Sequence, residues 1–163
     1  MTNIKQILIE KFGEEIILQE MDGIMAILKV PAQQIEHVCK FLLTDSQLFF
    51  DSLSCLTAID NGPEKGTMEV VYNLYSIPYD HKITVKIEIA RNSIHESIPK
   101  VPTVSGVWHS ANWAEREAYD LLGIEFEGHP DLRRILMPSD WEGYPLRKDY
   151  QQQELYHGIT VKY

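Results

Sequence analysis

The chain has 163 residues, 44% hydrophobic and 24% charged, which is the composition of a folded globular protein long enough for one domain. Its formal net charge of −9 opposes binding to nucleic-acid phosphates and to anionic membrane surfaces, so we expect no nucleic-acid partner. No apolar run approaches the roughly 20 residues that cross a bilayer, so any membrane association is expected to be indirect, through a partner.

The first quarter of the chain predicts two amphipathic helices separated by a pair of strands. Residues 4–12 carry apolar side chains on one helical face, and a glycine follows them. Residues 15–19 and 24–30 are predicted strands, joined by a turn at residues 21–23. Pro31 suits the first turn of the next helix. The buried stripe of that helix is predicted to be Ile35, Val38, Cys39 and Leu42.

Three further strands are predicted at residues 52–59, 68–75 and 82–89. The last of them alternates cleanly between apolar and polar residues, which predicts one buried and one solvated face. Together with the two helices, these strands predict an α+β fold, in which a mostly antiparallel or mixed sheet carries helices on one face.

A last helix is predicted at residues 112–122. Asn112, with Glu115 three residues later, resembles a capping box, and Gly123 suits a left-handed C-cap. After Gly123 the regular patterns stop, although bulky apolar residues remain frequent up to residue 150. Such a segment is expected to be ordered against something other than its own small domain. We therefore predict an α+β domain at residues 1–122 and an extended C-terminal segment, residues 123–163, that wraps partner subunits.

The sequence offers no sign of a bound cofactor. Cys39 and Cys55 are expected to be buried free thiols, and two cysteines cannot supply the four thiolates of an ordinary iron–sulfur cluster. Neither of the glycine-rich phosphate-binding motifs is present. We predict no metal, flavin or nucleotide in this chain.

The acidic residues of the last helix admit two interpretations. Glu115, Glu117 and Asp120 form either a solvated charged face or, with His129, a catalytic cluster. Arg116 has the i, i+4 spacing for an ion pair with Asp120. His129 is expected to bond backbone groups, in a turn or across an interface, rather than to bind a metal.

Positive charge concentrates in the C-terminal segment of this acidic chain. Arg133, Arg134, Arg147 and Lys148 are interpreted either as surface charges that aid solubility or as anchors to acidic surfaces of partners. The planar fork of arginine is enriched at interfaces. At least one of the three arginines is predicted to bind a carboxylate of a neighbouring subunit.

The sequence Glu-Arg-Glu-Ala-Tyr-Asp-Leu-Leu-Gly-Ile at residues 115–124 begins a longer motif. It continues as Gly-His-Pro-Asp-Leu-Arg-Arg-Ile-Leu at residues 128–136 and as Pro-Leu-Arg-Lys-Asp-Tyr at residues 145–150. This pattern resembles the signature of the C subunit of NADH-quinone oxidoreductase, respiratory complex I. The resemblance runs from about residue 30 to residue 150, loosely at first and strongly in the final third. One departure is the Leu-Leu pair at residues 121–122, where methionine or a bulkier aromatic is expected at one position.

The resemblance implies a cofactor-free subunit of the peripheral arm, packed beside the quinone-site subunit and its iron–sulfur neighbours. NADH, FMN, the iron–sulfur clusters and quinone are expected on other subunits. The expected location is peripheral, on the cytoplasmic side of the bacterial cell membrane. Two alternatives stay open: an equivalent subunit of a membrane-bound hydrogenase or a ferredoxin-fed complex, and a free-standing enzyme. The predicted partner interface comprises Glu115, Arg116, Glu117, Asp120, His129, Arg133, Arg134, Trp141, Pro145, Leu146, Arg147, Lys148, Asp149 and Tyr150.

Overall fold

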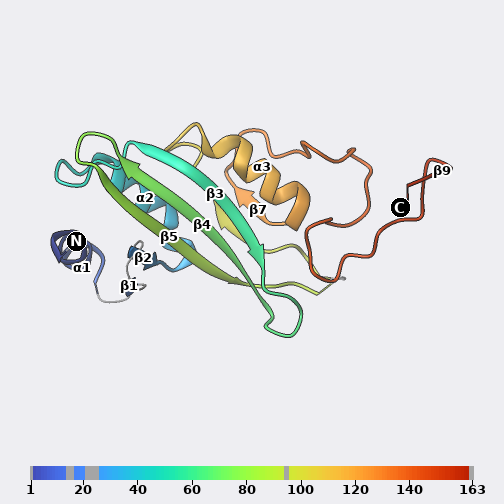
Figure 1. The fold of residues 1–163 in the computed structure, drawn as a ribbon, viewed down its shortest axis with the longest axis horizontal. Helices are drawn as coiled ribbons and strands as arrows, with labels where there is room; N and C mark the ends of the chain where they lie inside the picture. Colours follow the sequence, from blue (N-terminus) through green and yellow to red (C-terminus); the bar gives the residue numbers. More distant parts are fainter. Residues whose placement is uncertain (1, 14–16, 21–25, 94–95, 162–163) are drawn as a thin grey trace.

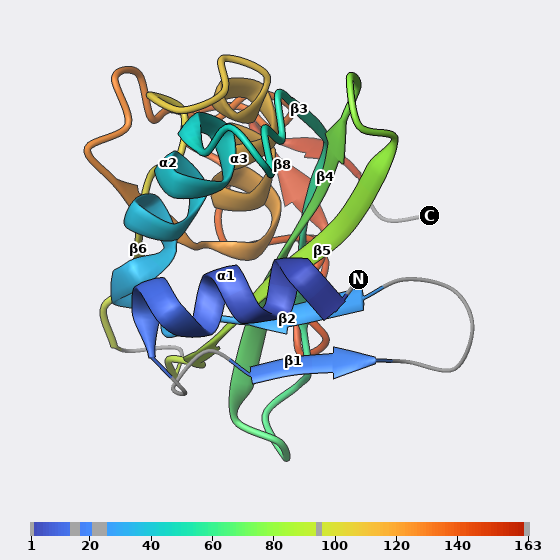
Figure 2. The same cartoon turned by 90° about the vertical axis from the view of Figure 1, so that its left-hand side faces the viewer.

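A five-stranded mixed sheet forms the centre of the molecule, with helices over one of its faces (Figures 1 and 2). The computed structural model describes residues 2–13, 17–20, 26–93 and 96–161. The strand order is β1-β2-β5-β4-β3, and every neighbouring pair is antiparallel except β2–β5. The predicted α+β class is therefore confirmed. The strands are β1 (Ile17–Glu20), β2 (Ala26–Lys29), β3 (Ser52–Asp60), β4 (Thr67–Ser76) and β5 (His81–Ala90).

The helices close the core from one side of the sheet. Helix α2 (Ile35–Thr44) follows a short 3₁₀ turn (Ala32–Gln34), and its predicted stripe of Ile35, Val38, Cys39 and Leu42 is fully buried. Helix α1 (Thr2–Phe12) packs on α2 through an edge-to-face contact between Phe12 and Phe41. Helix α3 (Ala111–Leu122) packs against β3, where its small Ala111 and Ala118 are buried. The predicted turn at residues 21–23 lies outside the described residues.

A β-bulge in β3 corrects one prediction. The pairing with β4 passes from Leu53 opposite Leu74 directly to Cys55 opposite Asn73, so Ser54 has no partner. Because an extra residue reverses the alternation of side chains, Leu53 and Leu56 share the buried face and Cys55 lies on the uncovered one. The expectation that both cysteines are buried is correct for Cys39 and wrong for Cys55.

Helix α3 begins differently from the prediction. Its N-cap residue is Ser110, before the predicted helix starts, and no side chain caps the first turn. The capping box of Asn112 and Glu115 is therefore absent, because the Glu115 side chain turns into the protein instead. The predicted end is confirmed, since Gly123 adopts a left-handed conformation with φ of 67°.

Short strands on both sides of α3 were not predicted. Strand β6 (Lys100–Pro102) pairs in parallel with β7 (Glu125–Glu127), which fastens the start of the C-terminal segment beneath α3. Further along, β8 (Leu155–Tyr156) and β9 (Ile159–Thr160) form a small hairpin. Backbone pairing therefore crosses the predicted boundary between residues 122 and 123, while the wrapping of partners stays a prediction.

Two helix-ending glycines allow a matched test of how tightly the C-terminal segment packs. Gly13 and Gly123 both have a positive φ, but a Cβ at Gly13 would meet nothing, whereas one at Gly123 would lie 2.5 Å from the ring of Tyr144. Gly13→Ala should cost about 1 kcal/mol of unfolding free energy from left-handed strain. Gly123→Ala should cost about 3 kcal/mol, because overpacking adds to the same strain. Urea denaturation checks both, and equal losses would mean that Tyr144 is not held against α3.

Candidate interface of the C-terminal segment

The carboxylate of Asp120 organises the loop that lies along α3. Its Oδ2 accepts hydrogen bonds from three consecutive backbone N–H groups, those of Ile135, Leu136 and Met137, at 2.7–3.0 Å. Its Oδ1 accepts a bond from Arg134 at 2.8 Å. Burial raises the pKa of Asp120, but these bonds outweigh burial and leave the pKa below its usual value. The fully buried Asp120 is therefore charged at neutral pH and fixes the loop.

Arg116 holds the same loop one helical turn earlier. Its guanidinium donates to the carbonyl oxygens of Arg133 and Arg134 at 3.2 and 3.4 Å. It also lies 5.4 Å from the centre of the Trp113 ring, at cation–π distance. The predicted ion pair between Arg116 and Asp120 is wrong, because the loop brings its own guanidinium, that of Arg134, to Asp120.

Three large side chains project from this framework into solvent. The exposed fractions are 67% for Trp113, 72% for the Arg133 side chain and 63% for Leu136. Arg133 uses Nε to bind Asp131 at 3.0 Å, and within the described residues its two terminal nitrogens donate no hydrogen bond. We call Trp113, Arg133 and Leu136 the α3–loop surface. Tryptophan and arginine are among the residue types most enriched in interface hot spots.

Glu115 is enclosed rather than solvated. Its side chain has no exposed surface and accepts bonds from the Thr103 hydroxyl at 2.5 Å and from the backbone N–H of Val104 at 2.7 Å. Burial raises the pKa of Glu115 to about 7, although both bonds act in the opposite direction. The interpretation of the acids as a solvated face is therefore correct only for the exposed Glu117, since Glu115 and Asp120 are buried.

His129 bonds to backbone on both sides of its ring, as predicted. Nδ1 accepts the N–H of Asp131 at 3.0 Å, so the proton sits on Nε2, which donates to the carbonyl of Asn112 at 3.1 Å. Nε2 lies 4.0 Å from Glu115, and neither side chain has exposed surface. A substrate cannot reach this pair, and Glu117 points to solvent elsewhere, so the geometry does not favour the catalytic hypothesis.

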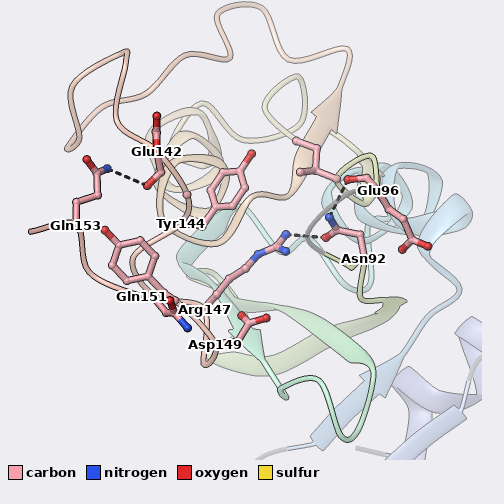
Figure 3. A pocket seen from close by; sticks show the side chains of 11 residues that line it. Asn92, Glu96, Glu142, Tyr144, Arg147, Asp149, Gln151 and Gln153 are labelled. Atoms are coloured by element: carbon pink, nitrogen blue, oxygen red, sulfur yellow. Dashed lines mark hydrogen bonds between the residues drawn. The ribbon is translucent and has the colours of Figure 1, made fainter.

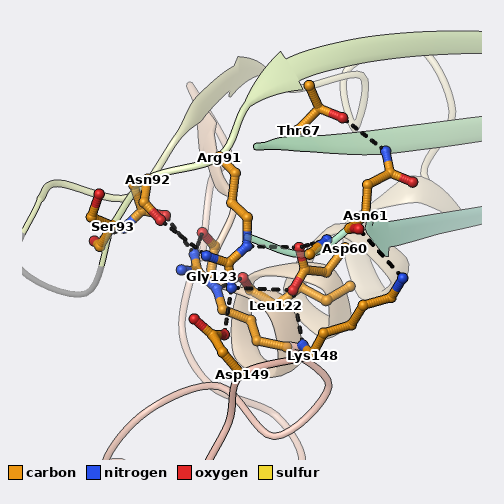
Figure 4. Close-up of polar contacts among 12 residues, drawn as sticks. Asp60, Asn61, Thr67, Arg91, Asn92, Ser93, Leu122, Gly123, Lys148 and Asp149 are labelled. Atoms are coloured by element: carbon orange, nitrogen blue, oxygen red, sulfur yellow. Dashed lines mark hydrogen bonds and ion pairs between the residues drawn. The ribbon is translucent and has the colours of Figure 1, made fainter. Parts of the chain in front are cut away.

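A second anchor ties the C-terminal segment to the end of the sheet (Figure 4). Arg91, directly after β5, binds both oxygens of Asp60 at 2.8 and 3.2 Å and also pairs with Asp149. The backbone N–H of Lys148 donates to the same Asp60 at 2.9 Å. Burial raises the pKa of Asp60, but these bonds and one from Gly62 bring it below its usual value. Segments far apart in sequence thus share one charged cluster.

Arg147 sits at the carboxyl end of α3. It donates to the carbonyl oxygens of Leu122 and Gly123 and to the side-chain oxygen of Asn92, at 2.7–3.1 Å. Its guanidinium lies 4.9 Å from the centre of the Tyr144 ring. A helix C-terminus is the negative end of the helix dipole, so the guanidinium is favourably placed there. Arg147 therefore fixes the segment within its own chain.

An open cavity of about 580 Å³ lies beside Arg147 (Figure 3). Its walls come partly from Asn92, Glu96 and Ile98, after β5, and partly from residues between Glu142 and Gln153. The cavity consequently exists only while the C-terminal segment lies on the body. Figure 3 shows Asn92 and Tyr144 flanking the Arg147 side chain, with Asp149 below it.

The structure gathers the predicted interface residues along α3 and the end of the sheet, but most of them also bind within the chain. Trp141 donates to the hydroxyl of Tyr150 at 3.1 Å, and Leu146 is 58% exposed beside α3. The exposed residues are Glu117, Arg133, Leu146 and Lys148. Glu115, Arg116 and Asp120 are buried, and His129, Arg134, Trp141, Pro145, Arg147, Asp149 and Tyr150 are intermediate.

Sequence reasoning missed Trp113, Asp60 and Arg91. Trp113 stands three residues before Arg116, a spacing that brings two side chains of a helix together. The contact between them could therefore have been predicted from the sequence. Asp60 and Arg91 lie 31 residues apart with no local pattern between them. Only the pairing of β3, β4 and β5 brings them into contact.

Comparison with protein families places the chain among known sequences. The family model described as "Respiratory-chain NADH dehydrogenase, 30 Kd subunit" matches residues 28–156. Two relatives are named as the C subunit of NADH-quinone oxidoreductase: one from Chloroherpeton thalassium is 44% identical and one from Chlorobium phaeobacteroides is 42% identical, each over 94% of this chain. The chain spans 62% of the first relative's length and 90% of the second's.

Among solved structures, the fold is shared with a chain of the membrane-bound sulfane sulfur reductase, described as an archaeal respiratory membrane complex. The TM-score is 0.72, over 92% of this chain and 85% of that one. At 24% identity this likeness shows the fold alone.

The buried acid predicts an unusual pH dependence of stability. Because the pKa of Glu115 rises from 4.5 to about 7 on folding, the folded state binds more protons than the unfolded state between these values. Stability from this group is therefore full below about pH 4.5 and falls as pH rises to about 7. Glu115→Gln should remove that loss, so the variant gains roughly 3 kcal/mol relative to the parent between pH 4.5 and 7. Urea denaturation across this range checks it; a constant difference would contradict the raised pKa.

Proposed function

The chain belongs to the family of the respiratory-chain NADH dehydrogenase 30 kDa subunit, and we propose that it is a cofactor-free peripheral-arm subunit of a proton-translocating NADH:quinone oxidoreductase. In this role it scaffolds the quinone-site subunit and the neighbouring iron–sulfur subunits. The electron-transfer activity belongs to the assembled complex, and the isolated chain has no activity of its own.

The main observation behind the proposal is that hydrogen bonds within the chain hold the α3–loop surface in place while its side chains stay exposed. The loop is held by a fully buried carboxylate and by Arg116, yet Leu136 and Arg133 stay exposed. Intrachain bonds have already ordered these groups, so a partner need not supply the entropy of fixing the loop. A preorganised surface with an aromatic ring, an aliphatic side chain and an arginine fork is suited to a stable contact with a neighbouring protein.

The positions of the possible metal ligands are in line with the proposal that this chain binds no metal. Within the residues that the structure describes, no group of three or more His, Cys, Asp or Glu side chains could hold a metal ion. Cys39 lies in the core under α2, while Cys55 lies on the uncovered face of the sheet, so the two thiols cannot bind one cluster.

Membrane attachment is proposed to be peripheral, through the other subunits and on the cytoplasmic side. No helix in the described part of the chain is long and apolar enough to span a bilayer.

The alternative is the equivalent subunit of a membrane-bound hydrogenase or a ferredoxin-fed complex. The fold shared with the sulfane sulfur reductase chain is compatible with either role. The much higher identity to relatives named for NADH-quinone oxidoreductase favours the first. Native purification through a tag on this chain decides between them. NADH-oxidising and quinone-site subunits should copurify; hydrogenase or ferredoxin-linked subunits instead would establish the alternative.

The isolated chain is predicted to carry no prosthetic group. After native purification, metal analysis and visible absorption should find no stoichiometric iron, zinc or flavin, because the thiols are separated and the phosphate-binding loops are missing. A tightly bound metal or flavin at one equivalent per chain would contradict the cofactor-free role.

Arg133 is predicted to bind a carboxylate of a neighbouring subunit. Arg133→Ala should leave that acid unpaired in the interface, at a cost of about 2–5 kcal/mol, or roughly thirtyfold or more in association. Arg133→Lys should also weaken assembly, because an ammonium cannot reproduce the bidentate fork. The melting temperature of the free chain should hardly move, since Arg133 is 72% exposed.

Arg134→Ala is the matched control in the adjacent position. Arg134 binds Asp120 and the carbonyl oxygens of Trp141 and Gly143 within the chain, so its loss should lower the melting temperature of the free protein. Thermal melting and the yield of assembled complex are measured for each variant. Normal assembly of both Arg133 variants would show that Arg133 is only a solvated charge.

A further inference from the structure

Three apolar side chains are exposed together near the β4–β5 turn, at the opposite end of the molecule from the C-terminal segment. Phe49 is 41% exposed, Ile77 64% and Tyr79 45%. Figure 1 shows the turn that joins β4 and β5 at one end of the molecule and the orange-to-red C-terminal segment at the other. We call Phe49, Ile77 and Tyr79 the turn surface.

Hydrogen bonds make the turn surface continuous and rigid. Its three side chains come from two loops, the one after α2 and the β4–β5 turn. These loops are hydrogen-bonded to each other at two points. The N–H of Ile77 donates to Asp51 at 2.9 Å, and the hydroxyl of Tyr79 donates to the carbonyl of Ser46 at 2.6 Å. The three side chains are therefore presented from one fixed framework rather than scattered over the surface.

The backbone conformation at Phe49 favours a residue other than phenylalanine. Residue 49 has φ of 37°, a left-handed conformation that turns the chain so that both Leu48 and Phe50 are buried. Glycine or asparagine adopts this conformation at least cost, whereas phenylalanine is strained in it. The fold thus explains the left-handed turn but not a half-exposed aromatic ring at its centre.

The two segments that carry the turn surface are acidic. Residues 45–51 and 77–82 contain Asp45, Asp51 and Asp80 against a single lysine, Lys82, a net charge of −2 with histidine neutral. The carboxylates of Asp51 and Asp80 are fixed by bonds from Ile77 and Tyr75. An apolar patch with an acidic border is complementary to an apolar segment that carries lysine or arginine at its edges.

We propose that the turn surface is a second docking site, which receives an apolar, lysine- or arginine-bordered segment of a neighbouring subunit. The chain would then contact partners at both ends of its sheet and fix the distance between them. The inference rests on the proposed function only in that the chain works inside a multi-subunit complex.

The direct test places a photo-crosslinking phenylalanine derivative at residue 77 of the full chain, in the purified native complex. Irradiation should link it to one segment of another subunit that contains both apolar and basic residues, identified by mass spectrometry. The proposal would be overturned by crosslinks to a second copy of this chain or to lipid. It would also be overturned if the derivative reacted with solvent alone. If the unmodified chain fails to enter the complex at all, the proposed function fails instead.

Substitution supplies an independent test. Phe49→Asn removes the ring but suits the left-handed backbone, so relief of strain should offset part of the burial that the ring loses, and the free chain should still fold cooperatively in urea denaturation. Assembled complex should fall at least about fivefold, as expected for loss of an interface anchor. Ile59→Thr is the matched control, because Ile59 is 42% exposed but lies on the uncovered face of the sheet. If the Phe49→Asn variant assembles as well as the control and the parent, the turn surface is not a docking site.

Discussion

The buried carboxylate of Asp120 and the loop that surrounds it depend on each other. Without the hydrogen bonds from the loop that buries it, Asp120 would be an uncompensated buried charge, a state that costs several kcal/mol. Without Asp120, three consecutive backbone N–H groups would lose their acceptor. The loop is therefore held mainly through its backbone. Two of its side chains, Leu136 and Arg133, are left free to face solvent, while that of Arg134 binds Asp120.

The same arrangement of a buried charge and a bonded chain recurs at the end of the sheet. Arg91 joins Asp60 at the end of β3 to Asp149, and Arg147 binds the last carbonyl groups of α3. The C-terminal segment is thus fastened along the helix and at the strand ends by polar contacts. This explains how a stretch with little regular structure can be ordered on its own domain and still keep apolar residues for a partner.

The internal charges also limit what the chain can do by itself. Glu115 and His129 lie 4.0 Å apart with no exposed surface, so they support the packing of α3 rather than a reaction on a substrate. The exposed groups with interface character lie instead on the α3–loop surface and, at the other end of the sheet, on the turn surface. If both proposed surfaces bind partners, the domain would hold neighbouring subunits at a fixed distance, in line with the scaffolding role proposed above.

The sequence by itself determined the elements whose periodicity is local: the buried stripe of α2, the glycine end of α3 and the family signature in the final third. The alternation of β5 was predicted only in part, because Ile83, Val85 and Ile87 are buried but so is Thr84. The sequence could not determine which charges are buried. Glu115 and Asp120 lie on α3 with an ordinary pattern of helix charges, and their burial depends on residues 103–104 and 134–137, which reach them only in the folded chain. The bulge that exposes Cys55, and the contact between Asp60 and Arg91, likewise follow from strand pairing. Periodicity describes one segment at a time, whereas the solvation of a charge depends on every segment packed around it.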